Sequence, residues 1–246
     1  LNMLGEYRPN SIFNLFNQTH TRGGKMMIES RFQQPLNDAE AINNRVSVFK
    51  YYQEKALKFP VEDELFTAID HYFSTSGGGH VLGSYLNTGK RKLMNYIGAD
   101  KEYEVIRDGV LAAIRFLAIF RQFVNELAAG DVPAIYRPRL DVVQTFFGDK
   151  RLGFVFATPD RKQLSWNQVA AYDQVLRGEC REEVQEMMQL FYEVDAVLSI
   201  TNVARERGFT YAKALPFETG KNTIELKEVY HPWLERAVPN TLTLNH

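Results

Sequence analysis

The sequence predicts a mainly α-helical protein, and three features support this prediction. Apolar residues recur every three or four positions over most of the chain, as on one face of a helix. Two long stretches keep this rhythm without a break, Lys101–Ala129 and Glu179–Arg207. Strand-like alternation is confined to the part that begins at Thr223. We therefore expect a helical core with two long antiparallel lever helices, a short β connector at the lever tip and a few C-terminal strands.

The composition is typical of a globular protein without a bias toward nucleic acid. Hydrophobic residues make up 45% of the chain and charged residues 24%, and 29 basic against 30 acidic residues give a net charge of -1. There is thus no overall electrostatic attraction to DNA, and any DNA contact must be local. The single cysteine, Cys180, excludes an internal disulfide and a cysteine-based zinc cluster. It favours a reducing compartment, and we expect a cytoplasmic protein without a membrane partner.

Three helices are expected at the start of the chain. Ser11 can cap the first, and we expect the Gly23-Gly24 pair to interrupt the pattern before the second. The second should stop ahead of Pro35, which disfavours helical geometry in the residue before it. The third should open at Asn37, with Glu40 three residues later as in a capping box.

A fourth helix is expected from Val61 to Phe73, and a glycine-rich stretch follows it. Gly83, Gly89 and Lys90 there resemble part of a phosphate-binding loop. The spacing of the glycines is one residue too long, and Arg91 stands where a serine or threonine would bind magnesium. We therefore interpret this stretch as a connection between helices.

The segment from about residue 130 to 165 breaks the helical rhythm with prolines and glycines. Leu152–Ala157 is expected to be a short strand. Basic residues alternate with aromatic ones here, which is typical of nucleic-acid surfaces. The candidate weak DNA-binding residues are Arg137, Arg139, Lys150, Arg151, Arg161 and Lys162. Four aspartates, including Asp149, offset most of this charge, so a packed connector with a solvated rim is the alternative.

Asp195 lies beside the apolar stripe of the last long helix, where a carboxylate is costly unless it has a partner. No second acid, histidine or metal-ligand set stands at a suitable spacing beside it, so catalysis is disfavoured. We expect Asp195 either to pair with an arginine or to cap a neighbouring helix. No catalytic residue and no metal ligand is predicted anywhere, and His231 shows no ligand spacing with the other histidines.

Two segments resemble the MutS family of DNA mismatch repair ATPases. The first contains Asn17, Thr19, Thr21, Gly24, Lys25, Gln34, Pro35, Leu36, Asp38, Glu40, Ile42, Asn43 and Arg45. The second contains Tyr192, Asp195, Ala196, Ser199, Val203, Ala204, Arg205, Gly208 and Phe209. They are similar to the start of the core domain of that family and to its returning lever helix.

The resemblance implies that residues 1–218 are a core and lever domain and that residues 219–246 are the first strands of a C-terminal ATPase domain. The chain begins without methionine and ends directly behind a strand-like stretch, so we expect a fragment cut before the P-loop. The fragment itself would be neither an enzyme nor a cofactor-binding protein. The parent would be a homodimeric, DNA-dependent ATPase that uses ATP and Mg²⁺, and the fragment's own contact with duplex DNA would be weak or indirect.

The family also implies a partial nucleotide site near the end of the chain. An apolar pair that packs on adenine corresponds to Ala237 and Val238, and Pro239 and Asn240 shape the following turn. Ordinary strand-edge residues are the alternative for this pair.

Two functions remain open. The first is the core and lever part of a mismatch-repair ATPase, which couples ATP binding to DNA engagement. The second is a helical scaffold or protein-interaction domain of a clampless relative without mismatch recognition, because the connector at about residues 130–165 is too short for the family's inserted DNA clamp.

Overall fold

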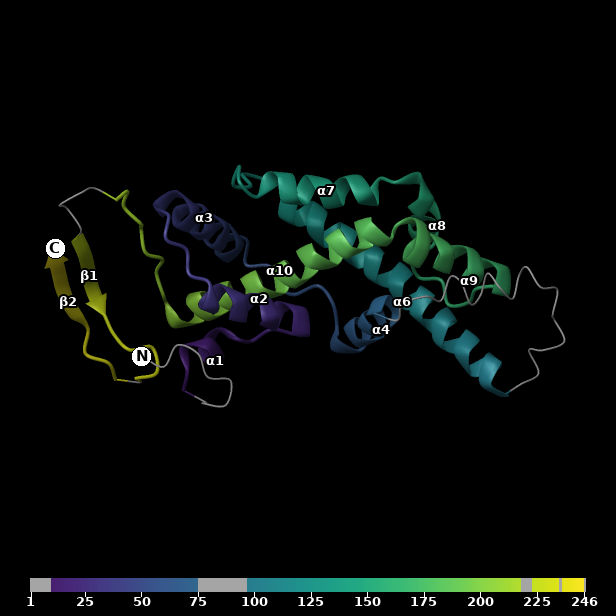
Figure 1. Ribbon diagram of the computed structural model, residues 1–246, viewed down its shortest axis with the longest axis horizontal. Helices are drawn as coiled ribbons and strands as arrows, with labels where there is room; N and C mark the ends of the chain where they lie inside the picture. The colour runs from purple at the N-terminus through teal and green to yellow at the C-terminus, as the bar shows by residue number, and fades with distance from the viewer. Residues whose placement is uncertain (1–9, 75–96, 218–222, 235, 246) are drawn as a thin grey trace. The chain divides into compact units, whose positions relative to one another are not determined.

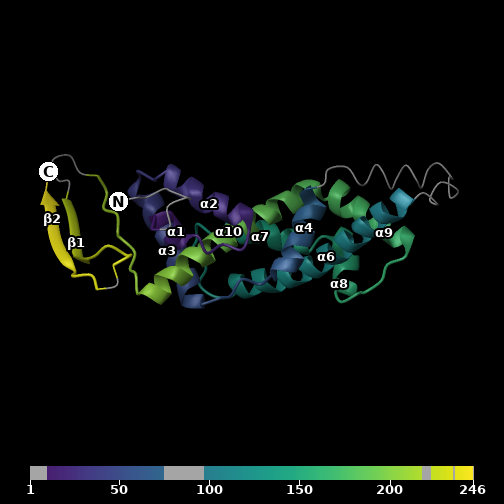
Figure 2. The ribbon, with the colours of Figure 1, turned by 90° about the horizontal axis from the view of Figure 1, so that it is seen from below.

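The computed structural model describes residues 10–74, 97–217, 223–234 and 236–245, and this part of the chain is mainly helical, as expected (Figures 1 and 2). The helices are α1 (Ile12–Phe16), α2 (Arg22–Gln33), α3 (Ala39–Lys55), α4 (Asp63–Ser74), α6 (Ile97–Ala128), α7 (Arg137–Phe147), the 3₁₀ turn η1 (Lys150–Leu152), α8 (Gly153–Ala157), α9 (Trp166–Asp173), the π-helix η2 (Gln174–Glu179) and α10 (Arg181–Arg207). The partial phosphate-loop pattern at Gly83 to Arg91 lies outside the described residues. Within the described ranges, no helix has the length and apolar character that a membrane crossing needs.

The chain divides into two compact units. The first unit contains residues 1–57 and 193–246, and the second contains residues 58–192, so that α10 belongs to both. The opening helices thus share a core with the returning long helix, so the core of this unit is discontinuous in sequence. The predicted boundary at about residue 218, between a core and lever domain and the first ATPase strands, stays a prediction.

The core of the first unit lies between α1, α2 and the later part of α10. Phe13, Ile28 and Ala196, one from each of these helices, form a buried cluster. Helix α3 is tied to the segment that follows α10, because the Asn43 side chain donates a hydrogen bond to the carbonyl of Ala214 (2.8 Å) and accepts one from its amide (3.0 Å). This unit therefore joins residues at both ends of the chain.

The helix starts differ from the prediction at two points. Gly23 and Gly24 do not interrupt a helix but lie in the first turn of α2, whose N-cap is Thr21. A Cβ atom on Gly24 would lie 2.3 Å from an oxygen of Asp195, so a glycine is needed here for close approach rather than for a break. The third helix is capped by Asp38, which accepts the amide of Ala41 at 2.7 Å, and not by Asn37.

In the second unit, α4, α7, α8 and α9 pack against the long helix α6. The ring of Phe191, on the first part of α10, meets the rings of Phe116 and Phe120 edge-on at centroid distances of 5.0 and 5.2 Å. Both long helices, α6 and α10, lie close to the bounds predicted from the sequence. Their antiparallel arrangement over the full length involves both units and stays a prediction.

The predicted short β connector is wrong. Leu152–Ala157 is not a strand, because η1 ends at Leu152 and α8 follows it directly. Asp149 caps this turn by accepting the amide of Arg151 at 2.8 Å. Leu152 and Val155 are both fully buried and stand three residues apart, which is a helical spacing. A short apolar run alone does not distinguish a strand from a helix, and tertiary packing decides here.

The predicted C-terminal strands are confirmed as an antiparallel pair, β1 (Thr223–Val229) and β2 (Asn240–Asn245). Ile224 pairs with Leu244 and Leu226 pairs with Leu242, so that these four side chains share one face. Each of them is more than one-third exposed. The hairpin therefore presents an apolar face that the described residues leave uncovered.

Candidate functional site

The buried carboxylate of Asp195 holds the start of α2 against α10. Its side chain accepts the amide of His20 at 3.0 Å, the amide of Thr21 at 2.8 Å and the hydroxyl of Thr21 at 2.6 Å. The residue is only 1% exposed. Because Thr21 is also the N-cap of α2, the carboxylate lies at the positive end of that helix. The cap of α2 is Thr21, whose hydroxyl accepts the amide of Gly24, and Asp195 holds this cap residue rather than capping the helix itself.

The protonation of Asp195 is governed by two opposing causes. Burial raises the pKa of its carboxyl, since the charged form loses its hydration, while the hydrogen bonds from Thr21 and His20 lower it. Burial prevails, and the net direction is upward. The junction is thus a buried acid held by neutral donors.

Ser199 lies one helical turn further along α10 and holds the same connection. Its hydroxyl accepts the amide of Gln18 at 2.7 Å and donates to the carbonyl of Phe16 at 2.5 Å. We call the segment from Phe16 to Thr21, together with Asp195 and Ser199, the α1–α2 junction. The structure thus brings together residues from two segments that lie far apart in the sequence.

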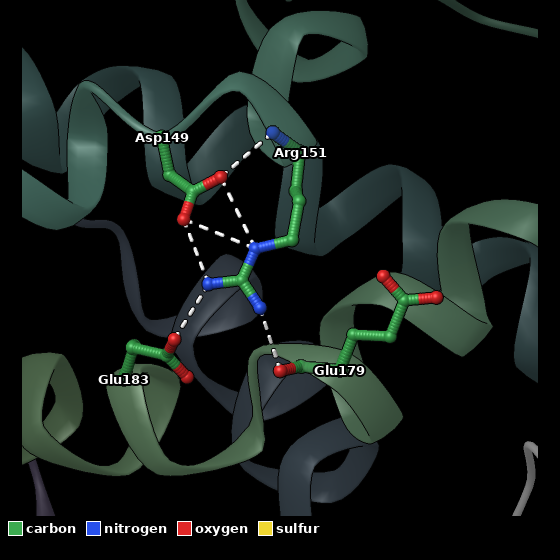
Figure 3. Close-up of polar contacts among 4 residues, drawn as sticks. All are labelled: Asp149, Arg151, Glu179 and Glu183. Atoms are coloured by element: carbon green, nitrogen blue, oxygen red, sulfur yellow. Dashed lines mark hydrogen bonds and ion pairs between the residues drawn. The ribbon is translucent and has the colours of Figure 1, made fainter.

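Arg151, predicted to contact DNA, is the centre of an internal polar cluster in the second unit (Figure 3). Its guanidinium bonds to both oxygens of Asp149, at 2.7–3.1 Å, and to Glu183 at 2.6 Å. It also donates to the backbone carbonyl of Glu179 at 2.8 Å, while the Glu179 carboxylate points away. One arginine therefore joins the turn after α7 to η2 and to the first turn of α10.

The electrostatics of this cluster follow from its hydrogen bonds. Those from Arg151 lower the pKa of Asp149 and of Glu183, and the two carboxylates in turn raise the pKa of Arg151. Its charge is thus already compensated within the protein. A phosphate would have to displace both acids in order to use it.

Two more of the predicted DNA-binding residues make internal contacts. Arg137 donates to the carbonyls of Ala128 (3.0 Å) and Gly130 (3.2 Å) and so closes the end of α6. Arg161 donates to the hydroxyl of Tyr172 at 3.2 Å. Arg139 is partly exposed, and Lys150 and Lys162 are exposed. Of the six predicted DNA-binding residues, Arg137, Arg151 and Arg161 are therefore used at least partly in contacts within the protein.

The four residues predicted to border adenine lie together just before and at the start of β2. Val238 is 78% exposed, and Ala237 is partly buried. The amide of the Asn240 side chain donates to the carbonyl of Val238 at 3.1 Å, which stabilises a turn around Pro239. Their role in binding adenine stays a prediction.

A second buried carboxylate, Asp173 of α9, was not found from the sequence. It forms an ion pair with Arg177 and accepts the Arg177 Nε–H at 2.6 Å and the hydroxyl of Tyr72 at 2.8 Å. The guanidinium also lies over the Tyr72 ring, 4.5 Å from its centroid. The available signal was the spacing of four residues between Asp173 and Arg177, which is common on solvent-exposed helix faces as well.

A cavity of about 840 Å³ lies between the end of α4 and the first part of α10. Its lining includes Arg181, Glu182 and Glu186 and thus carries charges of both signs. None of the site residues predicted from the sequence lines it. Within the described ranges, no three histidine, cysteine or acidic residues are grouped so that they could hold a metal ion.

Comparison with known proteins identified no relative of this chain. No protein-family model, no curated protein and no solved structure matches the chain.

Proposed function

We propose that this chain is the core and lever part of a MutS-like ATPase, which couples ATP binding in the parent protein's C-terminal domain to DNA engagement. One observation supports it above others: the two segments that resemble the family, far apart in sequence, form a single network at the α1–α2 junction. Thr21 of the first segment and Asp195 of the second share two hydrogen bonds. These residues lie 174 positions apart in the sequence, so their contact supports the interpretation of the two segments as parts of one core.

The apolar face of the β1–β2 hairpin also supports this proposal. A two-stranded hairpin is marginally stable alone, and an apolar face is normally covered by another layer. Nine of the fourteen exposed large apolar side chains in the described residues lie between Leu215 and Leu244. We propose that the ATPase domain of the parent packs on this face.

A second function is favoured by the Arg151 cluster. Arg151, Arg137 and Arg161 all have protein partners at the tip where the family's mismatch-repair members carry a DNA clamp. A helical scaffold in a clampless relative, without mismatch recognition, agrees with this use of the basic residues. Both candidates keep the ATPase and differ in their relation to DNA.

The experiment that tests the first function uses the parent protein and measures its affinity for duplex DNA with and without ATP. We expect ATP to change that affinity, and we expect Asp195→Ala to reduce the change while leaving ATP binding intact. An affinity that does not respond to ATP would contradict the coupling. A matched and a mismatched duplex, titrated at increasing salt, separate the two functions. The scaffold predicts weak, salt-sensitive binding without preference for the mismatch.

A further inference from the structure

Helix α1 is too short to be stable without its neighbours. It has five residues, Ile12–Phe16, and isolated helices of this length do not persist in water. Ser11 caps it by accepting the amide of Asn14 at 3.1 Å, and Phe13 and Leu15 are buried. Its position is therefore set by its neighbours, which are the core that buries Phe13 and Leu15 and the residues that contact its two ends.

The segment that follows β1 contacts the first end of α1 directly and reaches its other end through Phe209. At the first end, the indole Nε1–H of Trp233 donates to the carbonyl of Ser11 at 3.2 Å. At the other end, the rings of Tyr230 and Phe209 lie 6.4 Å apart, and those of Phe209 and Phe16 lie 6.1 Å apart. A shift of the hairpin would therefore change the support of α1 at both ends.

The last residue of α1 and the segment that follows it are hydrogen-bonded to α10. Ser199 binds the carbonyl of Phe16 and the amide of Gln18, and Asp195 binds the amides of the two residues before α2. The last residue of α1 is thus in contact with the hairpin side through Phe209 and with α10 through Ser199. All of these contacts lie within the first unit.

We propose that α1 is the coupling element between the β1–β2 hairpin and α10. A displacement of the hairpin moves α1 through Trp233 and Tyr230. The movement of α1 then changes the hydrogen bonds of Ser199 and Asp195 at the α1–α2 junction. This inference rests on the proposed function for its purpose, since the hairpin would carry the motion of the ATPase domain. The dependence of the α1–α2 junction on Trp233 can be tested in this chain by itself, without the ATPase domain.

Hydrogen exchange of the 246-residue chain tests this dependence. Trp233→Phe keeps an aromatic ring and removes the indole donor to Ser11. We expect the amides of Gln18, His20 and Thr21 to exchange roughly fivefold faster in this variant, because a hydrogen bond that supports α1 is lost. Trp166→Phe is the matched control, since it removes the other tryptophan, at the start of α9 in the second unit. The control should leave the three amides unchanged.

Unchanged exchange at the three amides in Trp233→Phe would overturn the proposal. Equal acceleration throughout α3 would overturn it as well, because it would indicate a general loss of stability in the first unit. Acceleration confined to α1 and the α1–α2 junction supports it.

A double-mutant cycle then tests transmission through α1. Ser199→Ala removes the contact on the α10 side, and Trp233→Phe removes the one on the hairpin side. If α1 transmits, the effects of the two changes on exchange at His20 and Thr21 are not additive. Additive effects would show two independent supports and overturn the proposal. None of these measurements needs ATP or DNA, so they can succeed even if the proposed function fails.

Discussion

Two buried aspartates, one in each unit, are stabilised in opposite ways. Asp195 is held by two backbone amides and a threonine hydroxyl, all neutral. Asp173 is held by the guanidinium of Arg177 and by a tyrosine hydroxyl. The first arrangement joins segments that are 174 residues apart through their backbones, whereas the second pairs side chains four residues apart. The comparison shows that burial of a carboxylate does not tell what it does: one joins distant segments of the chain, and the other keeps a charge balanced.

The largest effect is expected from breaking the charge balance in the second unit. Arg177→Met leaves the carboxylate of Asp173 buried without its cation, which typically costs about 3–5 kcal/mol of the free energy of unfolding. Urea unfolding measures the loss. Cys180, the only cysteine of the chain and fully buried in this unit, should then react faster with a thiol reagent under native conditions.

The control for this prediction removes both charges. Asp173→Leu combined with Arg177→Met has no buried charge, and we expect it to recover most of the lost stability. If the single and the double variant were equally unstable, charge balance would not be the reason.

The long helices, the opening helices and the hairpin could be predicted from local pattern, but α7, α8 and the contacts between elements could not. The apolar stripe beside Asp195 indicates a buried carboxylate, yet the partners of this residue are too distant in the sequence to be predicted. The Gly23-Gly24 pair has the local pattern of a break, since nothing near it in the sequence indicates that a carboxylate lies against Gly24. Local pattern predicts that Arg151 contacts DNA, because its partner Glu183 is distant in the sequence and comes close only in the folded chain. What the sequence missed is tertiary in each case.

The second prediction breaks the neutral arrangement in the first unit. Asp195→Ala leaves three donors of His20 and Thr21 without their acceptor in a buried place, and each such loss costs about 1–3 kcal/mol when no water replaces it. We expect a total near 3 kcal/mol, because the exposed side of His20 admits some water. Urea unfolding followed by hydrogen exchange in α1 and α2 measures it. Native-state reaction of Cys180 should not change, which sets this variant apart from Arg177→Met.

The third prediction concerns the close approach of Gly24 to Asp195. Gly24→Ala places a methyl group 2.3 Å from the carboxylate oxygen, so either α2 or Asp195 must shift. Forced shifts of this kind cost about 1–3 kcal/mol. Gly153→Ala is the matched control, because nothing lies within 4 Å of a Cβ atom there and alanine favours the helix. If both variants were equally stable, the approach of Gly24 to Asp195 would not constrain the sequence.

The smallest effect is the pH dependence that Asp195 adds, because hydrogen bonds offset part of the effect of burial. The folded protein binds the Asp195 proton more tightly than the unfolded chain, in which the carboxyl titrates near its ordinary pKa of 3.8. The stability contributed by the neutral acid is therefore fully present below pH 3.8 and is lost as the pH rises through the raised pKa of the folded state. Asp195→Asn stays neutral at every pH. The free energy of unfolding of the unchanged protein, minus that of Asp195→Asn, should thus fall as the pH increases from 3.8 and become constant above the folded pKa. Urea unfolding of both proteins, from below pH 3.8 to neutrality, measures the difference. A difference that rises over this range would mean that the three donors favour the charged form more than burial opposes it.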